Sequence, residues 1–358
     1  MLSHPEGAKE LAEAVRSSAR VIVRGGGTKW VGNGDDDRAV IEMAGVSGVV
    51  DYQPGEFTFT ALAGTRLSEI DQVLSEHGQY LPFDPPWVEG GATLGGTVAM
   101  GISGPGRMRY GGVRDFLLGI CYVDAQGKLV SGGGKVVKNA AGFDLPKLFC
   151  GSLGRFGILA ELTFKVFPRP VEYWTLDCQV DGPVEAASLM NRLAGSPFEV
   201  DALDYLPRDR VLVRLGGDAG ALAARAERLV RAHSVSSEVV ERDAELEVWR
   251  NAREFAWAED KGLVKLAIGP RDLVRVDQTL ERLGMARRYS VGGNVVWVCL
   301  SDDGDVETLD EALQEMKLSG LVVRRGTGKR LIGSDRSGAF RKRVKGALDP
   351  RGRFADFA

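Results

Sequence analysis

Alternating hydrophobic and polar positions divide the first half of the chain into short strands and amphipathic helices. A helix is predicted after Pro5, because its apolar residues recur every three or four positions. Thr65 is the predicted N-cap of a second helix, and Gly78 is placed to end it. Strands are predicted at residues 20–24, 49–52, 57–63, 117–123, 128–130 and 158–167.

After the pair Pro168 and Pro170, the pattern changes to longer helices between strands. Strands are predicted at residues 173–180, 211–215, 263–268 and 291–300. Helices are predicted at residues 183–193, 219–232, 244–261, 271–283 and 306–318. This alternation favours an α+β domain with an antiparallel sheet and is compatible with two ferredoxin-like halves. The predicted parts are residues 1–170, 171–330, and a basic C-terminal segment, 331–358, that returns to the first domain.

The composition is that of a globular protein: 358 residues, 44% hydrophobic and 27% charged, with a net charge of −3. The acidic excess argues against a nucleic-acid-binding protein that neutralises phosphates. No apolar run approaches the roughly 18 residues that cross a bilayer, and no secretory signal is visible. The four cysteines lie too far apart for a zinc or iron–sulfur motif, so we expect no metal site and a cytoplasmic location.

Glycine is the compositional outlier, with 47 of 358 residues, or about 13% against a usual value near 7%. The excess is concentrated between Gly90 and Gly157 and has no collagen-like period. The Walker A, dinucleotide-binding and nucleophile-elbow templates all fail here. What remains is a run of glycines after the strand at residues 20–24, where backbone N–H groups can converge on an anion. A tight turn without a ligand is the alternative for this loop.

Four sequence blocks, in this order, carry a family resemblance. They are Arg24-Gly25-Gly26-Gly27-Thr28, the block 91–99, Tyr110-Gly111-Gly112-Val113-Arg114-Asp115, and the block 138–145 leading into 151–158. They resemble the FAD-linked oxidase family typified by vanillyl-alcohol oxidase and p-cresol methylhydroxylase. The resemblance covers about residues 20–170 and the C-terminal tail, and residues 81–170 look most like the small flavin-binding subunits of bacterial glycolate oxidase complexes. It implies a PCMH-type, two-subdomain FAD-binding domain with a smaller α+β cap.

The resemblance also implies which residues bind FAD. The first loop is expected to bind the pyrophosphate through backbone N–H groups, and Thr93 through its hydroxyl. For Asn139 and Asp144, the alternative is that they only satisfy loop backbone as Asx turns. The full set is Arg24, Gly25, Gly26, Gly27, Thr28, Gly91, Ala92, Thr93, Gly95, Gly96, Asn139, Asp144, Gly154, Gly157 and Ile158.

The chain departs from the family pattern in three ways. The first glycine loop has no histidine for covalent attachment, so FAD is expected to bind non-covalently. After Phe354 the tail lacks the usual Asn-Pro-Gly, so its approach to the flavin is not implied. The three histidines, His4, His77 and His233, do not form the cluster common in hydroxy-acid dehydrogenases of this family.

The resemblance implies hydride transfer from the substrate to flavin N5, aided by a base and by cations that hold a carboxylate. Arg107, Arg109 and Lys138 are the candidate cations and Tyr110 is a candidate polar partner, whereas no base is identifiable. For the cations, a solvated or ion-paired role is the alternative.

Three functions are therefore compared. The first is a flavin subunit of a glycolate (2-hydroxy acid) oxidase that passes electrons to an iron–sulfur subunit, beside a larger flavin subunit. Such a complex implies peripheral membrane association through its other subunits. The second is an independent FAD oxidoreductase acting on another hydroxy acid or alcohol. The third is a structural subunit that keeps the fold without turnover.

Overall fold

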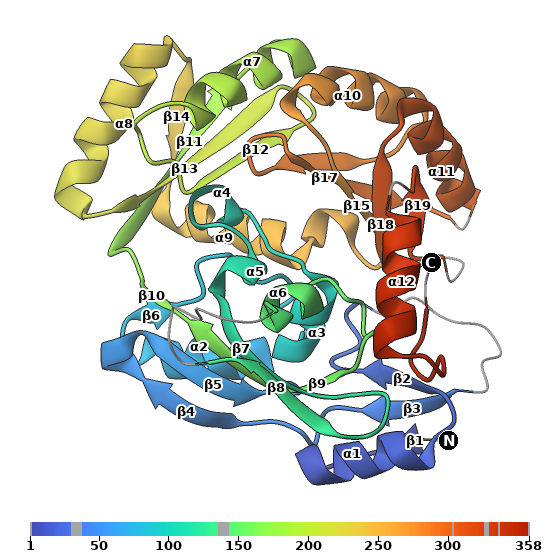
Figure 1. The fold of residues 1–358 in the computed structure, drawn as a ribbon. Coiled ribbons are helices and arrows are strands. Elements are labelled where there is room, and N and C mark those ends of the chain that lie inside the picture. Colours follow the sequence, from blue (N-terminus) through green and yellow to red (C-terminus); the bar gives the residue numbers. More distant parts are fainter. Residues whose placement is uncertain are drawn as a thin grey trace. The chain divides into compact units, whose positions relative to one another are not determined.

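The computed structural model describes residues 2–29, 38–134, 143–302, 304–325, 329–335 and 337–356. They form two compact units (Figure 1). The first unit consists of Met1–Ser103, Gly112–Pro168 and Arg336–Ala358, and the second of Gly104–Gly111 and Arg169–Asp335. The short segment Gly104–Gly111 therefore belongs to the second unit although the chain on both sides of it belongs to the first.

Two main sheets form the first unit. The parallel sheet has the order β1–β3–β2, with bounds Leu2–Ser3, Ala39–Glu42 and Val21–Arg24. The antiparallel sheet has the order β4–β5–β9–β7–β8, with bounds Val49–Gln53, Thr58–Leu62, Ile158–Lys165, Leu117–Val123 and Leu129–Gly133. A smaller pair joins β6 (Gln79–Tyr80) to β10 (Phe167–Pro168). The helices are α1 (Ala8–Ser17), η1 (Pro54–Glu56), α2 (Leu67–Ser75), α3 (Leu94–Met100), α5 (Val113–Phe116), α6 (Leu145–Phe149) and α12 (Gly338–Leu348).

An aromatic cluster fills the core beside the antiparallel sheet. Phe59 and Phe164 lie on the paired strands β5 and β9, with ring centroids 5.8 Å apart. Phe83 contacts both Phe164 and Phe116, at centroid distances of 6.2 and 5.6 Å. All four side chains are buried, and burial of each contributes about 2–3 kcal/mol to folding. This core supports the loops that carry the glycine blocks.

A buried lysine anchors the C-terminal segment within the first unit. Lys345 Nζ, in α12, donates to the carbonyl oxygens of Arg155 (2.8 Å) and Phe354 (2.9 Å) and to Asp349 Oδ2 (2.6 Å). Phe354 also forms a parallel bridge with Val21, the first residue of β2. The C-terminal segment therefore lies against the strand that leads into the first glycine loop.

One nine-stranded sheet, in which every recorded pairing is antiparallel, organises the second unit. Its order is β14–β11–β13–β12–β16–β17–β15–β18–β19. The strand bounds, in chain order from β11, are Glu172–Gln179, Ala202–Leu206, Arg210–Gly217, Ser237–Val240, Gly262–Ala267, Arg287–Ser290, Val295–Leu300, Ser319–Arg324 and Leu331–Gly333. The helices are α4 (Arg107–Tyr110), α7 (Gly182–Ala194), α8 (Ala219–His233), α9 (Arg242–Glu254), η2 (Ala256–Ala258), η3 (Pro270–Asp272), α10 (Leu273–Arg282) and α11 (Gly304–Met316).

The element order repeats within this unit. β11–α7–β12–β13–α8–β14 and β15–α10–β16–β17–α11–β18 are both βαββαβ units, and their strand orders are those of the ferredoxin-like fold. The two halves meet where Tyr205 of β12 pairs with Tyr289 of β16. The expected antiparallel α+β domain with two ferredoxin-like halves is thus confirmed, although the sequence shows no repeat.

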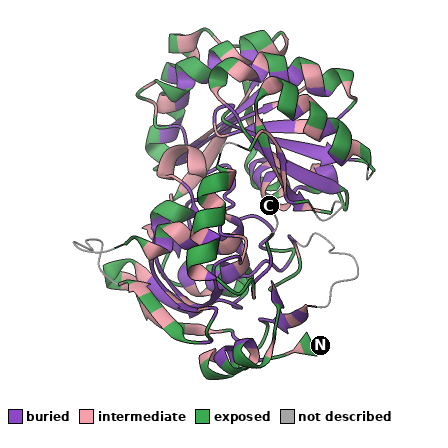
Figure 2. Cartoon of the chain, turned by 45° about the vertical axis from the view of Figure 1, so that its right-hand side comes forward, coloured by how far each residue is buried: buried purple, intermediate pink, exposed green. Residues whose placement is uncertain are grey.

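The helices of the second unit divide between the two faces of its sheet. α7, α8, α10 and α11 cover one face and α9 the other (Figure 1). Figure 2 shows buried strands between helices whose outward faces are exposed, the pattern of a one-sided apolar stripe. In α10 that stripe consists of Leu273, Val276 and Leu280, all buried.

The predicted cap of α2 is wrong. The helix begins at Leu67, and Arg66 occupies the N-cap position without a side-chain hydrogen bond. The Thr65 hydroxyl instead donates to the Leu62 carbonyl (2.7 Å) and accepts the Gly48 N–H (2.9 Å). Thr65 therefore stabilises the turn before the helix and does not cap the helix.

Two predicted elements of the second unit are too long. The helix expected at 244–261 ends at Glu254, because Phe255 adopts the left-handed conformation (φ 55°). The strand expected at 291–300 begins at Val295, after a turn in which Val291 and the next two glycines have positive φ. In both cases, residues with positive φ make the element shorter than the range that hydrophobicity suggests.

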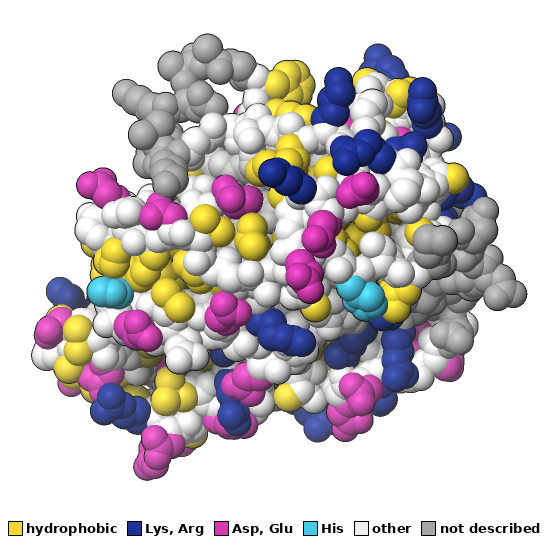
Figure 3. Space-filling view, turned by 90° about the horizontal axis from the view of Figure 1, so that it is seen from below, with side chains coloured by type: hydrophobic (Ala, Val, Ile, Leu, Met, Phe, Trp, Pro, Cys, Tyr) yellow, Lys and Arg dark blue, Asp and Glu magenta, His cyan; other side chains and the backbone are white. Residues whose placement is uncertain are grey.

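The surface seen in Figure 3 mixes acidic, basic and hydrophobic side chains. On this face, among the residues drawn in colour, neither sign of charge forms a continuous field. None of the described helices has the length and hydropathy needed to span a bilayer.

Candidate functional site

The first glycine loop follows β2 directly and presents a row of backbone donors. The N–H groups of Gly25, Gly26, Gly27 and Thr28 donate to no other residue within the described part of the chain. Gly27 has φ +74°, a conformation that glycine adopts without strain. Successive N–H groups in such a turn form a concave nest that binds an anion. The Arg24 side chain forms an ion pair with Glu42 of β3.

The second glycine block is built onto the end of β5 and the start of α3. Thr93 is the N-cap of α3, and its Oγ1 accepts the Gly96 N–H at 3.3 Å. The N–H of Gly95 donates to the Ala63 carbonyl oxygen at 2.8 Å. A Cβ at Gly95 would lie 2.7 Å from the Ala63 Cβ, so only glycine allows this approach.

The two glycine loops lie against each other. A Cβ at Gly25 would overlap the Thr93 hydroxyl, and one at Gly26 would overlap the Gly91 carbonyl oxygen. That carbonyl also accepts a hydrogen bond from Arg66 at 3.2 Å. Gly25 and Gly26 therefore allow the two loops to pack closely. The sequence alone does not distinguish this packing role from contact with a ligand.

Gly27 and Gly154 face open space, and Gly96 faces only a hydroxyl and a lysine side chain. At Gly27 and Gly154, a Cβ would meet no described atom within 4 Å. At Gly96 it would meet the Thr93 hydroxyl at 3.0 Å and the Lys29 Cε at 4.0 Å. These positions form a cradle that added side chains would fill.

Lys29 places a positive charge between the two loops. Its side chain is buried, with Nζ 3.0 Å from Thr28 Oγ1 and 5.2 Å from the centroid of the Trp87 ring. Lys29 is not among the residues that the sequence predicts to bind FAD. The missed signal is a lysine immediately after a predicted anion-binding turn.

Two buried hydroxyl groups lie beside the cradle, one on α3 and one on the segment that follows α6. Thr97 Oγ1, in α3, and Ser152 Oγ have no hydrogen-bond partner among the described residues. The segments are linked because the Gly151 N–H donates to the Val98 carbonyl at 2.9 Å. Buried hydroxyls without partners are uncommon in folded proteins, and a bound polar group satisfies them.

Three further residues predicted to bind FAD have packing contacts within the protein. Ile158 is buried at the start of β9 and pairs with Val123 of β7. A Cβ at Gly157 would lie 2.7 Å from the Tyr122 ring, so this glycine allows β9 to approach β7. Ala92 is buried and accepts the Leu67 N–H.

Asp144 caps α6. Its carboxylate accepts the Lys147 N–H at 3.2 Å and pairs with Lys147 Nζ at 2.7 Å. The hydrogen bond from Lys147 lowers the pKa of Asp144 below its usual range. The Asx alternative thus accounts for Asp144 without a cofactor. Asn139 and Lys138 lie outside the described residues.

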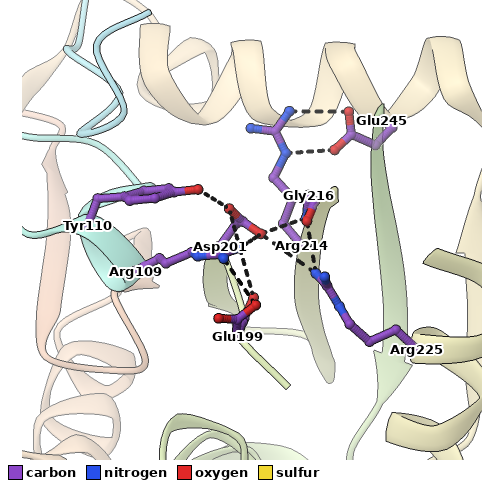
Figure 4. A network of polar contacts seen from close by, with 8 residues as sticks. All are labelled: Arg109, Tyr110, Glu199, Asp201, Arg214, Gly216, Arg225 and Glu245. Atoms are coloured by element: carbon purple, nitrogen blue, oxygen red, sulfur yellow. Dashed lines mark hydrogen bonds and ion pairs between the residues drawn. The ribbon is translucent and has the colours of Figure 1, made fainter. Parts of the chain in front are cut away.

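The candidate catalytic residues Arg107, Arg109 and Tyr110 all lie on α4, in the second unit. Figure 4 shows Arg109 and Tyr110 with their polar contacts. Arg109 and Tyr110 both contact the buried Asp201 carboxylate. Burial raises the pKa of Asp201 above its usual value, although Arg109 and the hydrogen bonds to Asp201 oppose this rise. Arg107 has no side-chain hydrogen bond or ion pair with another described residue.

A family comparison covers most of the segments that form the cradle. Residues 2–133 match the family described as an FAD binding domain. Residues 2–133 are an FAD-binding domain. The residues present fit FAD, because the nest, the space at Gly96 and the Lys29 charge are what a pyrophosphate requires.

Curated relatives of the FAD-binding domain include subunits of glycolate oxidases. The chain is 34% identical to glycolate oxidase subunit GlcE of Escherichia coli over 221 residues, which are 62% of this chain and 63% of that protein. It is 27% identical to glycolate oxidase subunit GlcD of Bacillus subtilis over 54% of this chain and 41% of the relative. It is 28% identical to D-lactate dehydrogenase of Anaerostipes hadrus over 52% of this chain and 38% of that relative. The matched segments span less than two thirds of each relative.

The fold also resembles a solved structure. Alkyldihydroxyacetonephosphate synthase superimposes with a TM-score of 0.72 at 15% identity, over 98% of this chain and 76% of that chain. This likeness, with the mixed helix and strand content, confirms the expected fold class.

Within the described residues, no three histidine, cysteine or carboxylate side chains are grouped as metal ligands. His77 packs on Tyr52 with centroids 5.4 Å apart, and His233 on Phe198 at 5.8 Å. The four cysteines form no disulfide with one another, and burial raises the pKa of Cys178 to about 12. None of these groups contributes an evident base.

Proposed function

We propose that this chain is the FAD-binding subunit of an oxidoreductase complex that oxidises a small 2-hydroxy acid, glycolate being the first candidate. The observation that carries the proposal is the 34% identity to a glycolate oxidase subunit over 221 residues. In this proposal electrons pass to an iron–sulfur subunit, because the separated cysteines of this chain do not form a cluster motif.

The roles of the chain's own residues follow from the cradle. The N–H groups of Gly25–Thr28 donate to pyrophosphate oxygens, and Lys29 neutralises part of their charge. Gly96 leaves room for close approach, and Thr97 supplies a buried hydroxyl. Bound FAD supplies the hydride acceptor at N5. Arg24, Ala92, Asp144, Gly157 and Ile158 have structural contacts of their own and are assigned a supporting role.

We further propose that FAD is bound without a covalent link, because no histidine occurs in the first glycine loop. Acid precipitation of the flavoprotein is expected to release all of the yellow chromophore into the supernatant. Colour that stays with the pellet contradicts this.

A stand-alone dehydrogenase of another hydroxy acid is the second candidate, favoured by the similarity to D-lactate dehydrogenases. Anaerobic addition of glycolate, D-lactate or L-lactate separates the candidates. Bleaching of the flavin band only when the larger flavin subunit and the iron–sulfur subunit are present supports the first proposal. Bleaching of the isolated chain supports the second. Bound flavin that dithionite reduces but no hydroxy acid bleaches, with or without partners, indicates a structural subunit.

A further inference from the structure

The C-terminal helix of the first unit, α12, has a buried inner side and an exposed basic outer side (Figure 1). On the inner side, Lys345 is buried and Val344 is partly buried. On the outer side, Lys342 and Arg343 are exposed, and Phe340 is 60% exposed. The outer side of α12 therefore presents one aromatic side chain and two cations to solvent.

The charge of the C-terminal segment is unbalanced. Residues 337–356 contain six lysines and arginines and two carboxylates, which gives a net charge of +4 within a chain whose net charge is −3. Both carboxylates are already paired. Asp349 accepts from Lys345 at 2.6 Å, and Asp356 pairs with Arg155 at 3.5 Å. Neither carboxylate is therefore available to neutralise the outer side of α12.

The exposed cations of α12 have no counter-charge within the described part of the chain. The side chains of Lys342 and Arg343 make no hydrogen bond or ion pair with another described residue. The helix from Gly338 to Leu348 contains no carboxylate, so the usual pairing at a spacing of three or four residues does not occur. Two neighbouring unpaired cations on one surface are complementary to an acidic partner.

The uncharged residues of the outer side favour a protein over a lipid surface as the partner. Apart from Phe340, they are the small exposed residues Ala339, Gly346 and Ala347. A helix that lies in a membrane interface needs a wide face of large apolar residues to enter the bilayer. Small residues instead allow a folded surface to approach closely. Phe340 then enters a pocket of that surface, and the cations pair with carboxylates around it.

The inner side of α12 is fixed to two segments that form the cradle. Lys345 Nζ donates to the carbonyl oxygen of Arg155, the residue that directly follows Gly154. It also donates to the carbonyl oxygen of Phe354, which bridges to Val21 in the strand that leads into the first glycine loop. A partner that binds the outer side of α12 is therefore held on the unit that carries the cradle.

We propose that the outer side of α12, with Phe340, Lys342 and Arg343, is the docking surface for an acidic face of the iron–sulfur subunit. This inference rests on the proposed function, which supplies that subunit as the acceptor of electrons. Interfaces between electron-transfer partners are small and are steered by charge, so binding depends strongly on salt. Phe340 adds a contact that salt does not screen.

The test titrates the flavin-loaded chain with the iron–sulfur subunit by calorimetry at low and at high salt. Lys342→Glu combined with Arg343→Glu should raise the Kd about 30-fold at low salt and less than about 3-fold at high salt, because salt screens exposed charges. Phe340→Ser should raise the Kd about 5-fold at both salt concentrations. FAD content and Tm should not change.

The matched control is Arg228→Glu combined with Arg231→Glu on α8. Both arginines are exposed and pair with no described residue, and their substitution makes the same change in net charge. The Kd of this control should stay within about 2-fold of the wild type at either salt concentration.

An unchanged Kd in the Lys342→Glu and Arg343→Glu variant, or an equal rise in the control, overturns the docking surface and leaves the proposed function standing. Self-association of the wild type through these residues also overturns it. So does binding of phosphatidylglycerol vesicles through them by a chain that binds neither the subunit nor poly-L-glutamate.

A wild-type chain that does not bind the iron–sulfur subunit contradicts the proposed function. Poly-L-glutamate then tests the docking surface alone. Binding of poly-L-glutamate that the Lys342→Glu and Arg343→Glu variant loses retains an acidic protein as the partner. No binding, or binding that the variant leaves unchanged, overturns the docking surface.

Discussion

The cradle of the first unit and the sheet of the second unit use polar groups in opposite ways. In the cradle, the donors are backbone N–H groups in glycine turns, with Lys29 as the added charge. In the second unit, side chains that are far apart in sequence meet over the sheet, as Arg109 and Asp201 do. In the proposed function the cofactor is thus held mainly by the main chain, whereas the polar contacts of the second unit depend on individual side chains.

The first unit also contains one side-chain centre that allows a direct comparison with Asp201. Lys345→Met removes the cation that holds Asp349, Arg155 and Phe354 together. We expect the free energy of unfolding to fall by about 3 kcal/mol, because a buried carboxylate loses its partner. Urea denaturation measures this, with Lys342→Met, on the exposed side of the same helix, as the control. Equal effects of the two substitutions contradict the anchoring role.

The packing and open glycines of the cradle should differ in the apoprotein. Gly26→Ala forces a Cβ onto the Gly91 carbonyl, so we expect a loss of about 2–3 kcal/mol in stability. Gly96→Ala meets only a hydroxyl at 3.0 Å and lies in a helix, so its effect should stay within about 1 kcal/mol. Thermal unfolding without FAD checks both. Equal destabilisation contradicts the division into packing and open positions.

Lys29 should contribute less than the backbone. Lys29→Met keeps the apolar stem over Trp87 but removes the charge near the nest. We expect the Kd for FAD to rise about 10-fold, since roughly 1.4 kcal/mol of charge interaction is lost. Titration of apoprotein with FAD at two salt concentrations measures this. A variant whose Kd and salt dependence match the wild type shows that Lys29 is not a phosphate partner.

The difference between the units also explains what the sequence predicts. Glycine blocks and helix patterns are local, so the fold class, the Gly25–Thr28 turn and Thr93 as part of the second loop are readable from the chain. Lys345 and Arg155 are 190 positions apart, and Arg109 and Asp201 are 92 apart, so no local pattern announces either contact. Phe255 ends α9 through a left-handed conformation that its residue type does not favour.

The central claim is that the FAD-binding domain holds its cofactor through the backbone cradle around Gly27 and Gly96. The direct measurement is the Kd for FAD of Gly96→Leu, obtained by flavin fluorescence on the full chain. Leucine suits a helix, and its Cβ would meet only the Thr93 hydroxyl and the Lys29 stem, so we expect FAD binding at least about 100-fold weaker with a Tm of the apoprotein within a few degrees of the wild type. Gly55→Ala, at an exposed glycine with no atom within 4 Å, should bind as the wild type does. Wild-type affinity in Gly96→Leu contradicts the assignment of this cradle.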